Sequence, residues 1–397
     1  MKMICLFIFM EVIFNNCYAK NNFADCDYTG AVDSSICLQN MIDLAASTHK
    51  KLYLREGILK ISKPLFLKND SYISGNNTVI EFKLDKPEKA LFNGNSVNNL
   101  NISKLNIIGY GIFSNESFIM PYPKLNKQYP KAIGFTNLDM GIKLLGNCKN
   151  ININNLFITG VEHGIFIKNV NSSNNKTTNI KLFNNIIKNI GKSAVTVINS
   201  QNIIIKNNII ENVLGNMDYN KLPKLENSKF ADGIYLNGVT NLKISNNKIS
   251  NIRRIGIVVE GQLNESNLVL NPNDNVVITN NKISNFNKSR GTENNAGIWV
   301  EPLNDKLNVI KYKTNHITIS NNIIDNQNAQ LGTHKQYGIF LGALNSIVRK
   351  NIILSSGNNK NIGIHCSFGN IYLRDNKFYN VLTDIVVESG SRYLNIL

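Results

Sequence analysis

The feature that most constrains this chain is a degenerate repeat that recurs from about residue 97 to the end. Its first half reads aliphatic-x-aliphatic-x-x-Asn-x-aliphatic, as in Leu242, Ile244, Asn247 and Ile249. Its second half reads Gly-Ile-x-aliphatic, as in the stretch Gly297–Val300. Apolar residues that alternate with period two predict short strands. A repeat of short strands specifies a stack of similar units, which brings side chains distant in sequence into one column.

The interval between copies identifies each unit as one coil of a parallel β-helix. The shortest intervals are about 22 to 25 residues, which is too short for a four-stranded propeller blade. A leucine-rich horseshoe needs a Leu-dominated frame and a helical return, and the sequence has neither. We interpret the recurring Asn as a turn residue, because Asn adopts the left-handed conformation and can hydrogen-bond to its copy one coil away. The expected fold class is all-β.

The N-terminus predicts export. Lys2 is followed by an apolar run from Met3 to Phe14, interrupted by Glu11, and residue 19 is a small alanine. This pattern is typical of a signal peptide over residues 1–19, so we expect a secreted or periplasmic protein. No apolar run approaches the length that spans a bilayer, and no membrane span is expected.

Export implies an oxidising compartment, where cysteines can pair. Cys26 and Cys37 are close enough in sequence to form a local disulfide. Cys148 and Cys366 fall on coils far apart in the stack, so we expect both to be small buried hydrophobic residues.

Composition indicates one elongated unit with a strong positive charge. Of the 397 residues, 43% are hydrophobic, and the formal net charge is +16. Two interpretations of the charge stay open: solvated lysines spread over every turn, or a positive field that attracts an acidic polysaccharide. Nucleic acid is not an expected partner, because no Arg-rich run with interleaved aromatic residues occurs.

The segment before the repeats resembles the opening of a known superfamily. A turn over Tyr28–Ser35 ends in good N-cap residues, and a helix follows with an apolar face. That face comprises Ile36, Leu38, Met41, Ile42 and Ala45. Strands are then expected at Leu52–Leu54, Ile58–Ile61, Pro64–Leu67 and Tyr72–Gly75.

This order is similar to that of the pectate-lyase-like right-handed parallel β-helix superfamily, which includes pectate lyases, polygalacturonases and phage tailspike depolymerases. The resemblance implies a right-handed β-helix, with an N-terminal cap and first coils over residues 20–96 and coils over 97–397. It does not by itself establish an enzyme, since one fold hosts many functions.

Long insertions predict a groove on one side of the stack. Residues 213–231, 286–296 and 326–336 precede the Gly-Ile-x-aliphatic strand, and residues 261–274 and 302–314 follow it. The segment 109–140 is expected to form a further wall. Loops on both sides of one strand column make its outward face the floor of a groove.

Two outward columns of side chains are predicted on that floor. The first carries Phe166, Thr196, Tyr235, Val258, Trp299, Phe340 and His365, whose aromatic rings suit the apolar faces of sugars. The alternatives are a column covered by a loop and, for His365, a structural role. The second column carries Lys168, Asn237, Glu260, Glu301, Gly342, Ser367 and Glu388. We expect His163, Phe166, Lys168, Tyr235, Trp299, Phe340 and His365 to bind substrate.

Glu260 and Glu301 fall on successive coils, so their backbones should lie about 4.8 Å apart. Two carboxylates at that separation can divide acid and base roles, or together hold a cation such as Ca²⁺. The alternative is an exposed pair neutralised by lysines.

Asp232 is similar to the Asp of the polygalacturonase Asn-Thr-Asp-Gly-Ile motif. That family has two further Asp one coil later, where this chain has Arg253 and Arg254, so its three-Asp mechanism is not supported. Arg254 is expected to point outward beside Glu260. With Lys168 or His163 it could serve β-elimination, which needs a base and positive charge near the substrate carboxylate.

The sequence therefore predicts an exported enzyme that binds and cleaves an acidic, uronic-acid-containing polysaccharide, with a lyase as the first hypothesis. A tailspike-like glycoside hydrolase that uses Asp232, Glu260 and Glu301 is the second. A non-catalytic polysaccharide-binding or assembly protein is the third. A C5-epimerase would be a variant of elimination, but no Asp-Pro-His-Asp stretch is present. A monomer and a homotrimer are both expected possibilities.

Overall fold

The computed structural model describes residues 26–84, 89–109, 117–119, 128–130, 139–169, 176–213, 231–263, 269–286, 295–301, 314–327, 335–357, 361–388 and 391–395. The predicted signal peptide lies outside these residues, as do most of the insertions predicted to wall the groove. Within the described segments, no helix combines the length and apolar character that crossing a bilayer requires.

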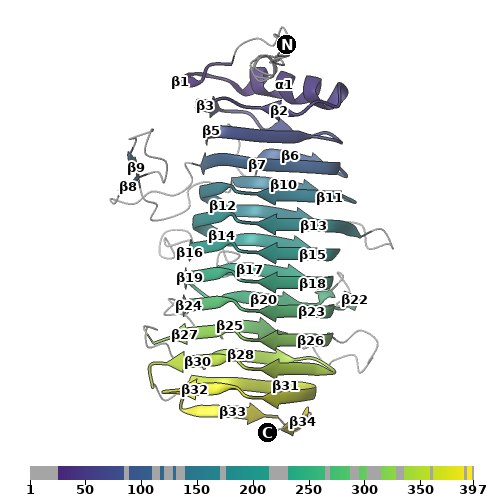
Figure 1. The fold of residues 1–397 in the computed structure, drawn as a ribbon, viewed down its shortest axis with the longest axis vertical. Helices are drawn as coiled ribbons and strands as arrows, with labels where there is room; N and C mark the ends of the chain where they lie inside the picture. Colours follow the sequence, from purple (N-terminus) through teal and green to yellow (C-terminus); the bar gives the residue numbers. More distant parts are fainter. Residues whose placement is uncertain are drawn as a thin grey trace, which may run out of the picture.

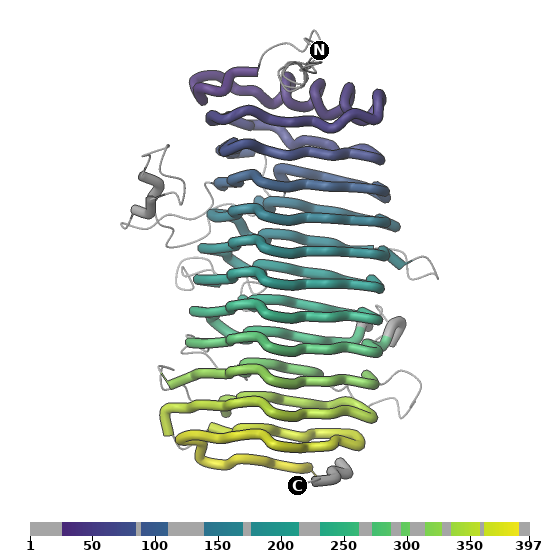
Figure 2. The backbone as a smooth tube through the Cα atoms, viewed as in Figure 1, coloured from purple at the N-terminus to yellow at the C-terminus, as the bar shows by residue number. Residues whose placement is uncertain are grey.

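The chain winds into a tall stack of coils, each built from up to three parallel strands (Figures 1 and 2). Equivalent strands of successive coils pair in register and form three sheets that run along the long axis. Sheet 1 contains β4 (Leu65–Phe66), β6 (Ala90–Asn95), β10 (Met140–Leu145), the second halves of β12 (Phe157–Lys168) and β14 (Ile186–Ile198), β17 (Asp232–Asn237), β20 (Ile257–Glu260), β25 (Asn295–Val300), β28 (Gln336–Gly342), the first half of β31 (Asn361–Arg374) and β33 (Thr383–Val387).

The other two sheets follow sheet 1 along each coil. Sheet 2 contains β2 (Leu52–Tyr53), the first halves of β5 (Tyr72–Phe82) and β7 (Asn98–Gly109), β11 (Lys149–Asn154), β13 (Thr177–Phe183), β15 (Ser200–Lys206), β18 (Thr240–Ser245), β23 (Asp274–Thr279), β26 (Asn315–Ser320), β29 (Ser346–Arg349), the second half of β31 and β34 (Ser391–Asn395). Sheet 3 contains β1 (Thr29–Asp33), β3 (Gly57–Ile61), the second halves of β5 and β7, the first halves of β12 and β14, β16 (Ile209–Val213), β19 (Lys248–Ile252), β24 (Lys282–Phe286), β27 (Ile323–Asn326), β30 (Ile352–Ser355) and β32 (Lys377–Tyr379). The predicted right-handed parallel β-helix is confirmed.

Two short antiparallel pairs lie outside this scheme, and the repeat did not predict them. β8 (Ser117–Ile119) pairs with β9 (Gln128–Pro130), inside the segment predicted as a wall. β21 (Gln262–Leu263) pairs with β22 (Val269–Asn271), inside another predicted insertion.

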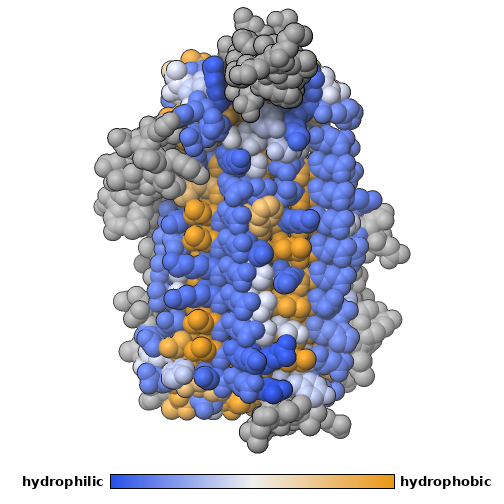
Figure 3. All heavy atoms as spheres, in the orientation of Figure 1, coloured by the Kyte–Doolittle hydropathy of each residue, from blue (hydrophilic) through white to orange (hydrophobic). Residues whose placement is uncertain are grey.

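The core is a continuous column of aliphatic side chains inside the coils. Residues such as Ile234, Ile257 and Ile298 alternate inward along the strands and are fully buried. The Gly that precedes them is required sterically, because a Cβ on Gly256 would lie 2.6 Å from the carbonyl oxygen of Gly297. Because side chains of one register position repeat from coil to coil, residues of like character form stripes along the long axis on the face shown in Figure 3.

The recurring Asn forms a buried ladder, as predicted. The side-chain amide of Asn247 donates to Oδ1 of Asn281 at 2.9 Å, and Asn281 donates to Asn322 at 3.0 Å. One part of the prediction is wrong, however: the left-handed conformation belongs to the preceding residue, as at Asn246 (φ 56°) and Asn280 (φ 56°). The turn is made one position earlier, so that the ladder Asn can point inward and bond to the backbone.

A helix closes the N-terminal end of the stack, as predicted (Figure 1). α1 (Ser35–Ser47) buries Leu38, Ile42 and Ala45 against the first coils. Ile36 was predicted on that face and is instead 65% exposed, because it lies about 200° around the helix from Leu38. Ser34 is the N-cap residue, and the side chain of Asp33 before it accepts a hydrogen bond from the backbone N–H of Ser35.

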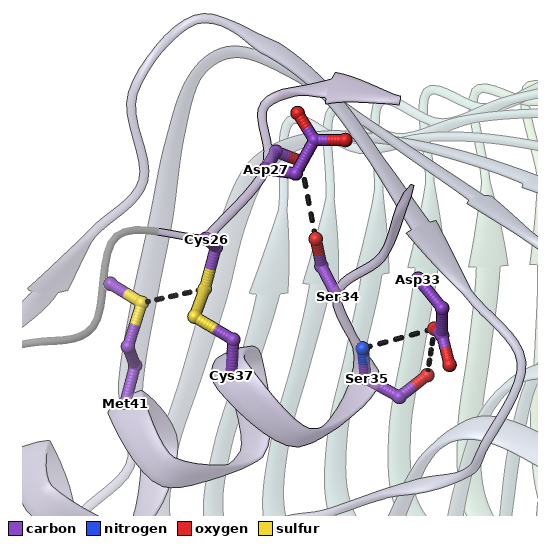
Figure 4. Close-up of a disulfide and its surroundings, with 7 residues drawn as sticks. All are labelled: Cys26, Asp27, Asp33, Ser34, Ser35, Cys37 and Met41. Atoms are coloured by element: carbon purple, nitrogen blue, oxygen red, sulfur yellow. Dashed lines mark hydrogen bonds between the residues drawn. A yellow bond between two sulfur atoms is a disulfide. The ribbon is translucent and has the colours of Figure 1, made fainter. Parts of the chain in front are cut away.

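The predicted disulfide between Cys26 and Cys37 is present and ties the segment before β1 to the first turn of α1 (Figure 4). Cys148 and Cys366 are buried, also as predicted. The end of the solenoid is therefore closed by both a helix and a covalent link.

Candidate active site

A cavity of about 650 Å³ lies over the outward side of sheet 1. It brings together eight of the residues predicted for the site. The first of them in sequence is His163 and the last is Glu301. The eight are His163, Phe166, Asp232, Tyr235, Arg254, Glu260, Trp299 and Glu301, joined by Lys192, Ser193, Thr196, Ile198 and Ile255. The strand register explains the convergence, because Phe166, Thr196, Tyr235, Val258 and Trp299 pair directly from coil to coil.

Glu260 is held by a hydrogen bond from the neighbouring coil. The hydroxyl of Tyr235 donates to Oε2 of Glu260 at 2.7 Å, and the amide of Asn237 donates to the Tyr235 oxygen at 3.2 Å. This chain of donors fixes one oxygen of Glu260 as an acceptor. A proton carried by Glu260 therefore resides on the other oxygen, Oε1.

The environment of Glu260 favours its protonated form. Burial raises the pKa of Glu260 to about 7, although the hydrogen bond from Tyr235 and the charge of Arg254 oppose the rise. The nearby negative charges of Glu301 and Asp232 add to it. Glu301 follows β25 on the next coil and is exposed, with its backbone N–H donating to the carbonyl of Val259 at 3.0 Å. The predicted side-by-side placement of the two glutamates is thus found.

Asp232 and Arg254 form a buried ion pair that sequence reasoning missed. Nε of Arg254 donates to one carboxylate oxygen of Asp232 at 2.8 Å, and Nη2 donates to the other. Asp232 is 0% exposed and Arg254 is 7% exposed. Arg254 lies on the cavity wall near Glu260, as expected, but its guanidinium group is directed to Asp232 rather than outward.

His163 lies at the end of the cavity nearer the N-terminus. Its Nδ1 is 3.3 Å from the Thr196 hydroxyl, and its ring packs edge-on against Phe166 at 5.2 Å. Burial, with the positive charges of Lys192 and Lys143, lowers the pKa of His163 to about 3. His163 is therefore neutral at physiological pH, and the positive charge at this end comes from lysine.

The aromatic column is a stack rather than a row of open faces. Trp299 and Phe340 lie parallel with ring centroids 3.9 Å apart, and Phe340 and His365 lie parallel at 4.9 Å. Because Phe340 covers one face of the indole, the face left toward the cavity is the one on the side of Val258. Phe340 and His365 do not line the cavity; they support Trp299 from the next two coils.

His365 fits the structural alternative. It is 3% exposed, and its Nε2 lies 2.8 Å from Oε1 of Glu388. The second predicted column also breaks at this end, because Gly342 pairs with Phe368 through a register shift instead of with Ser367. At the other end, Lys168 pairs with Ile198, and it is Ile198 rather than Lys168 that lines the cavity.

Lys192 is the charged cavity residue that the sequence analysis did not single out. It precedes Ser193, which pairs with His163, at a point where the register of β12 and β14 shifts. One sequence signal could have found Lys192. It directly precedes Ser193, and Ser193 occupies the position that Asp232 has on the next coil. Among the described residues, no cluster of three or more potential metal ligands occurs, so the predicted cation site consists of Glu260 and Glu301 alone.

The chain is therefore a parallel β-helix of three sheets, with paired acids and aromatic side chains in a hollow outside one sheet. No protein-family model and no curated protein sequence matches this chain. Solved structures do match it.

The Dettilon tailspike protein gp208 is similar with a TM-score of 0.61 at 14% identity, covering 92% of this chain and 68% of that one. The A-module of the mannuronan C-5 epimerase AlgE4 from Azotobacter vinelandii gives 0.51 at 14% identity, covering 94% of this chain and 98% of that one. An alginate lyase from Paenibacillus sp. gives 0.50 at 14% identity, covering 90% and 96%. At these identities the likeness shows the fold.

Proposed function

We propose that this protein cleaves an acidic polysaccharide, with Glu260 as the proton donor and Glu301 as its partner carboxylate in hydrolysis of a glycosidic bond. The observation that carries this proposal is the contrast between the two acids. Glu260 is half-buried and accepts a hydrogen bond from Tyr235, whereas Glu301 is exposed on the adjacent coil. Glycoside hydrolysis uses a pair of carboxyl groups, one of which donates a proton to the leaving oxygen.

The reaction would proceed at the bond that lies between the two acids. Oε1 of Glu260 gives its proton to the bridging oxygen while the bond from the anomeric carbon to that oxygen breaks. The Glu301 carboxylate either attacks the anomeric carbon or removes a proton from an attacking water. Water supplies the hydroxyl group of the new reducing end and returns a proton to the acids.

The rest of the cavity supports an acidic substrate. The Trp299 indole lines the cavity and offers apolar surface for one sugar ring. At the far end, Lys192 lines the cavity and supplies positive charge, and Lys143 lies in register with Phe166 on the preceding coil. A carboxylate on a sugar bound toward His163 would meet these lysines, while the scissile bond lies toward Glu260.

β-Elimination is a second candidate for the same site, and it was the first hypothesis from sequence. One observation favours it: Lys192 lines the cavity beside His163 and can neutralise a substrate carboxylate, while water would protonate the leaving oxygen. In that case Glu260, when ionised, removes the C5 proton. Arg254 was expected to supply the positive charge, but its pairing with Asp232 leaves that role to lysine.

The test is a panel of alginate, pectic and capsular polymers, scored for chain length, new reducing ends and unsaturated ends. Hydrolysis gives reducing ends without unsaturation, and elimination gives both. We expect Glu260→Gln and Glu301→Gln each to lower the rate at least about a hundredfold. Glu211→Gln, on sheet 3, is the matched control and should change nothing. Retention of a polymer with no change in length would instead favour the non-catalytic hypothesis.

A further inference from the structure

A second groove lies on sheet 2, on a different side of the coils from the candidate active site. It has a volume of about 720 Å³ and crosses β11, β13, β15, β18 and β23. None of its lining residues lines the cavity over sheet 1. The proposed chemistry therefore leaves this groove without a role.

One wall of the groove is a ladder of exposed asparagine side chains at the start of each sheet 2 strand. The amide of Asn275 donates to Oδ1 of Asn241 at 2.9 Å, Asn241 to Asn202 at 3.1 Å, and Asn202 to Asn179 at 3.3 Å. Each such bond uses one of the two N–H groups of the amide and one lone pair of its oxygen. The remaining donors and acceptors repeat at the coil spacing of about 4.8 Å.

The floor of the groove alternates positive and apolar side chains. Lys181, Ile204, Lys243 and Val277 occupy one register position on four successive coils. Neither lysine forms an ion pair within the described residues, and no acidic side chain lines the groove. The surface is therefore positive, rich in amides and partly apolar.

We infer that this groove is a second, non-catalytic binding site for an acidic polysaccharide. A chain of sugars presents hydroxyl groups for the asparagine ladder, carboxylates for Lys181 and Lys243, and C–H faces for Ile204 and Val277. A nucleic acid is less well matched, because the lining has no arginine and no aromatic ring on which a base could stack. The inference takes from the proposed function only the acidic class of the polymer.

The expected consequence is a difference between long and short substrates. A polymer held on sheet 2 is kept at a high effective concentration near the active site on sheet 1 of the same coils. Short oligosaccharides reach only one groove at a time. Loss of the sheet 2 groove should therefore weaken binding of polymers and leave turnover of oligosaccharides unchanged.

The test compares two charge-reversal variants with the same change in net charge. Lys181→Glu with Lys243→Glu alters the groove; Lys282→Glu with Lys377→Glu alters exposed lysines on sheet 3 and is the control. Both are made in the Glu260→Gln background, and affinity is measured for sodium alginate, sodium polygalacturonate, neutral dextran and duplex DNA. We expect the groove variant to bind an acidic polymer about tenfold more weakly than the control.

Each other outcome overturns the inference. Equal losses in both variants would show that binding follows diffuse charge, and unchanged affinity would show that the groove is not used. A loss confined to DNA would make the groove a nucleic-acid site. Failure of the parent protein to bind either acidic polymer would also reject it. The proposed function fails separately, if the wild-type chain binds a polymer and forms no new chain ends.

Discussion

The Tyr235 hydroxyl donates a 2.7 Å hydrogen bond to Oε2 of Glu260 across two adjacent coils. Because the amide of Asn237 donates to the same hydroxyl oxygen, the phenol proton is directed to Glu260. Burial also raises the pKa of Tyr235, so the phenol keeps that proton over the working range of pH. The two coils thus hold Glu260 in one orientation, with its free oxygen available for proton transfer.

If Glu260 is the proton donor, activity should fall as pH rises through about 7. Above that pH the side chain loses the proton that the leaving oxygen requires, because its pKa is about 7. The measurement is kcat/KM against pH on a cleaved polymer. A profile flat from pH 6 to 9 would contradict the assignment.

Tyr235→Phe should move that alkaline limb to higher pH. The hydrogen bond from Tyr235 stabilises the ionised carboxylate and so lowers the pKa of Glu260, and removing it lets the pKa rise. A merely structural role for Tyr235 would lower the rate without moving the limb. Tyr53→Phe, at an exposed tyrosine near the N-terminal cap, provides the comparison.

Glu260 should also make stability depend on pH. Its pKa is raised from 4.5 to about 7 in the folded state, so below pH 4.5 both states hold the proton and the shift has no effect. Between these values the unfolded chain loses its proton first, and stability falls as pH rises. Glu260→Gln should therefore stabilise the protein by about 3 kcal/mol at pH 8 and by nothing at pH 4. Denaturant unfolding at the two pH values measures both, and an equal effect at both would refute the account.

The ion pair of Asp232 and Arg254 predicts strong coupling between two substitutions. Asp232→Asn leaves a buried guanidinium group without its partner charge and should cost about 3–5 kcal/mol of unfolding free energy. Replacing both residues by apolar ones, Asp232→Leu with Arg254→Met, should cost less than either single change. A double-mutant cycle by urea unfolding measures the coupling, and additive losses would argue against it.

The two asparagine ladders should contribute very different amounts to the free energy of unfolding. Asn281 is buried and bonds through its amide to the carbonyl of Ile244 as well as to Asn322, so Asn281→Ala should destabilise by about 2–4 kcal/mol. Asn275 is exposed with φ 53°, so Asn275→Gly should cost less than about 1 kcal/mol. Thermal or urea unfolding of the two variants decides the point. Similar losses would mean that the exposed ladder also supports the fold.

The fold could be predicted because each coil repeats the same pattern of residues. Ile recurs where an aliphatic side chain points into the core, and Asn recurs where a buried amide ladder forms. Gly recurs where the strand has no space for a Cβ atom. Period-two alternation then placed Glu260 and Glu301 on one outward surface. Neither step required the insertions, whose lengths follow no repeat.

The missed features depend on side-chain partners that a repeat does not encode. Asp232 is the first residue of β17, but Arg254 lies in the bend before β20, so their pairing follows from the geometry of that bend rather than from strand register alone. Lys192 stands beside a register shift. The stack of Trp299 on Phe340 could have been foreseen, since aromatic side chains on coils about 4.8 Å apart are close enough to cover each other.

Each coil contacts only the coils before and after it, and its three sheets face solvent in different directions. Outward-facing residues of one sheet can therefore be substituted without changing the surfaces of the other two. Substitutions on sheet 2 leave the geometry of sheet 1 intact, and the converse holds. A scaffold of this kind lets the choice of polymer and the chemistry done on it diverge independently over evolutionary time.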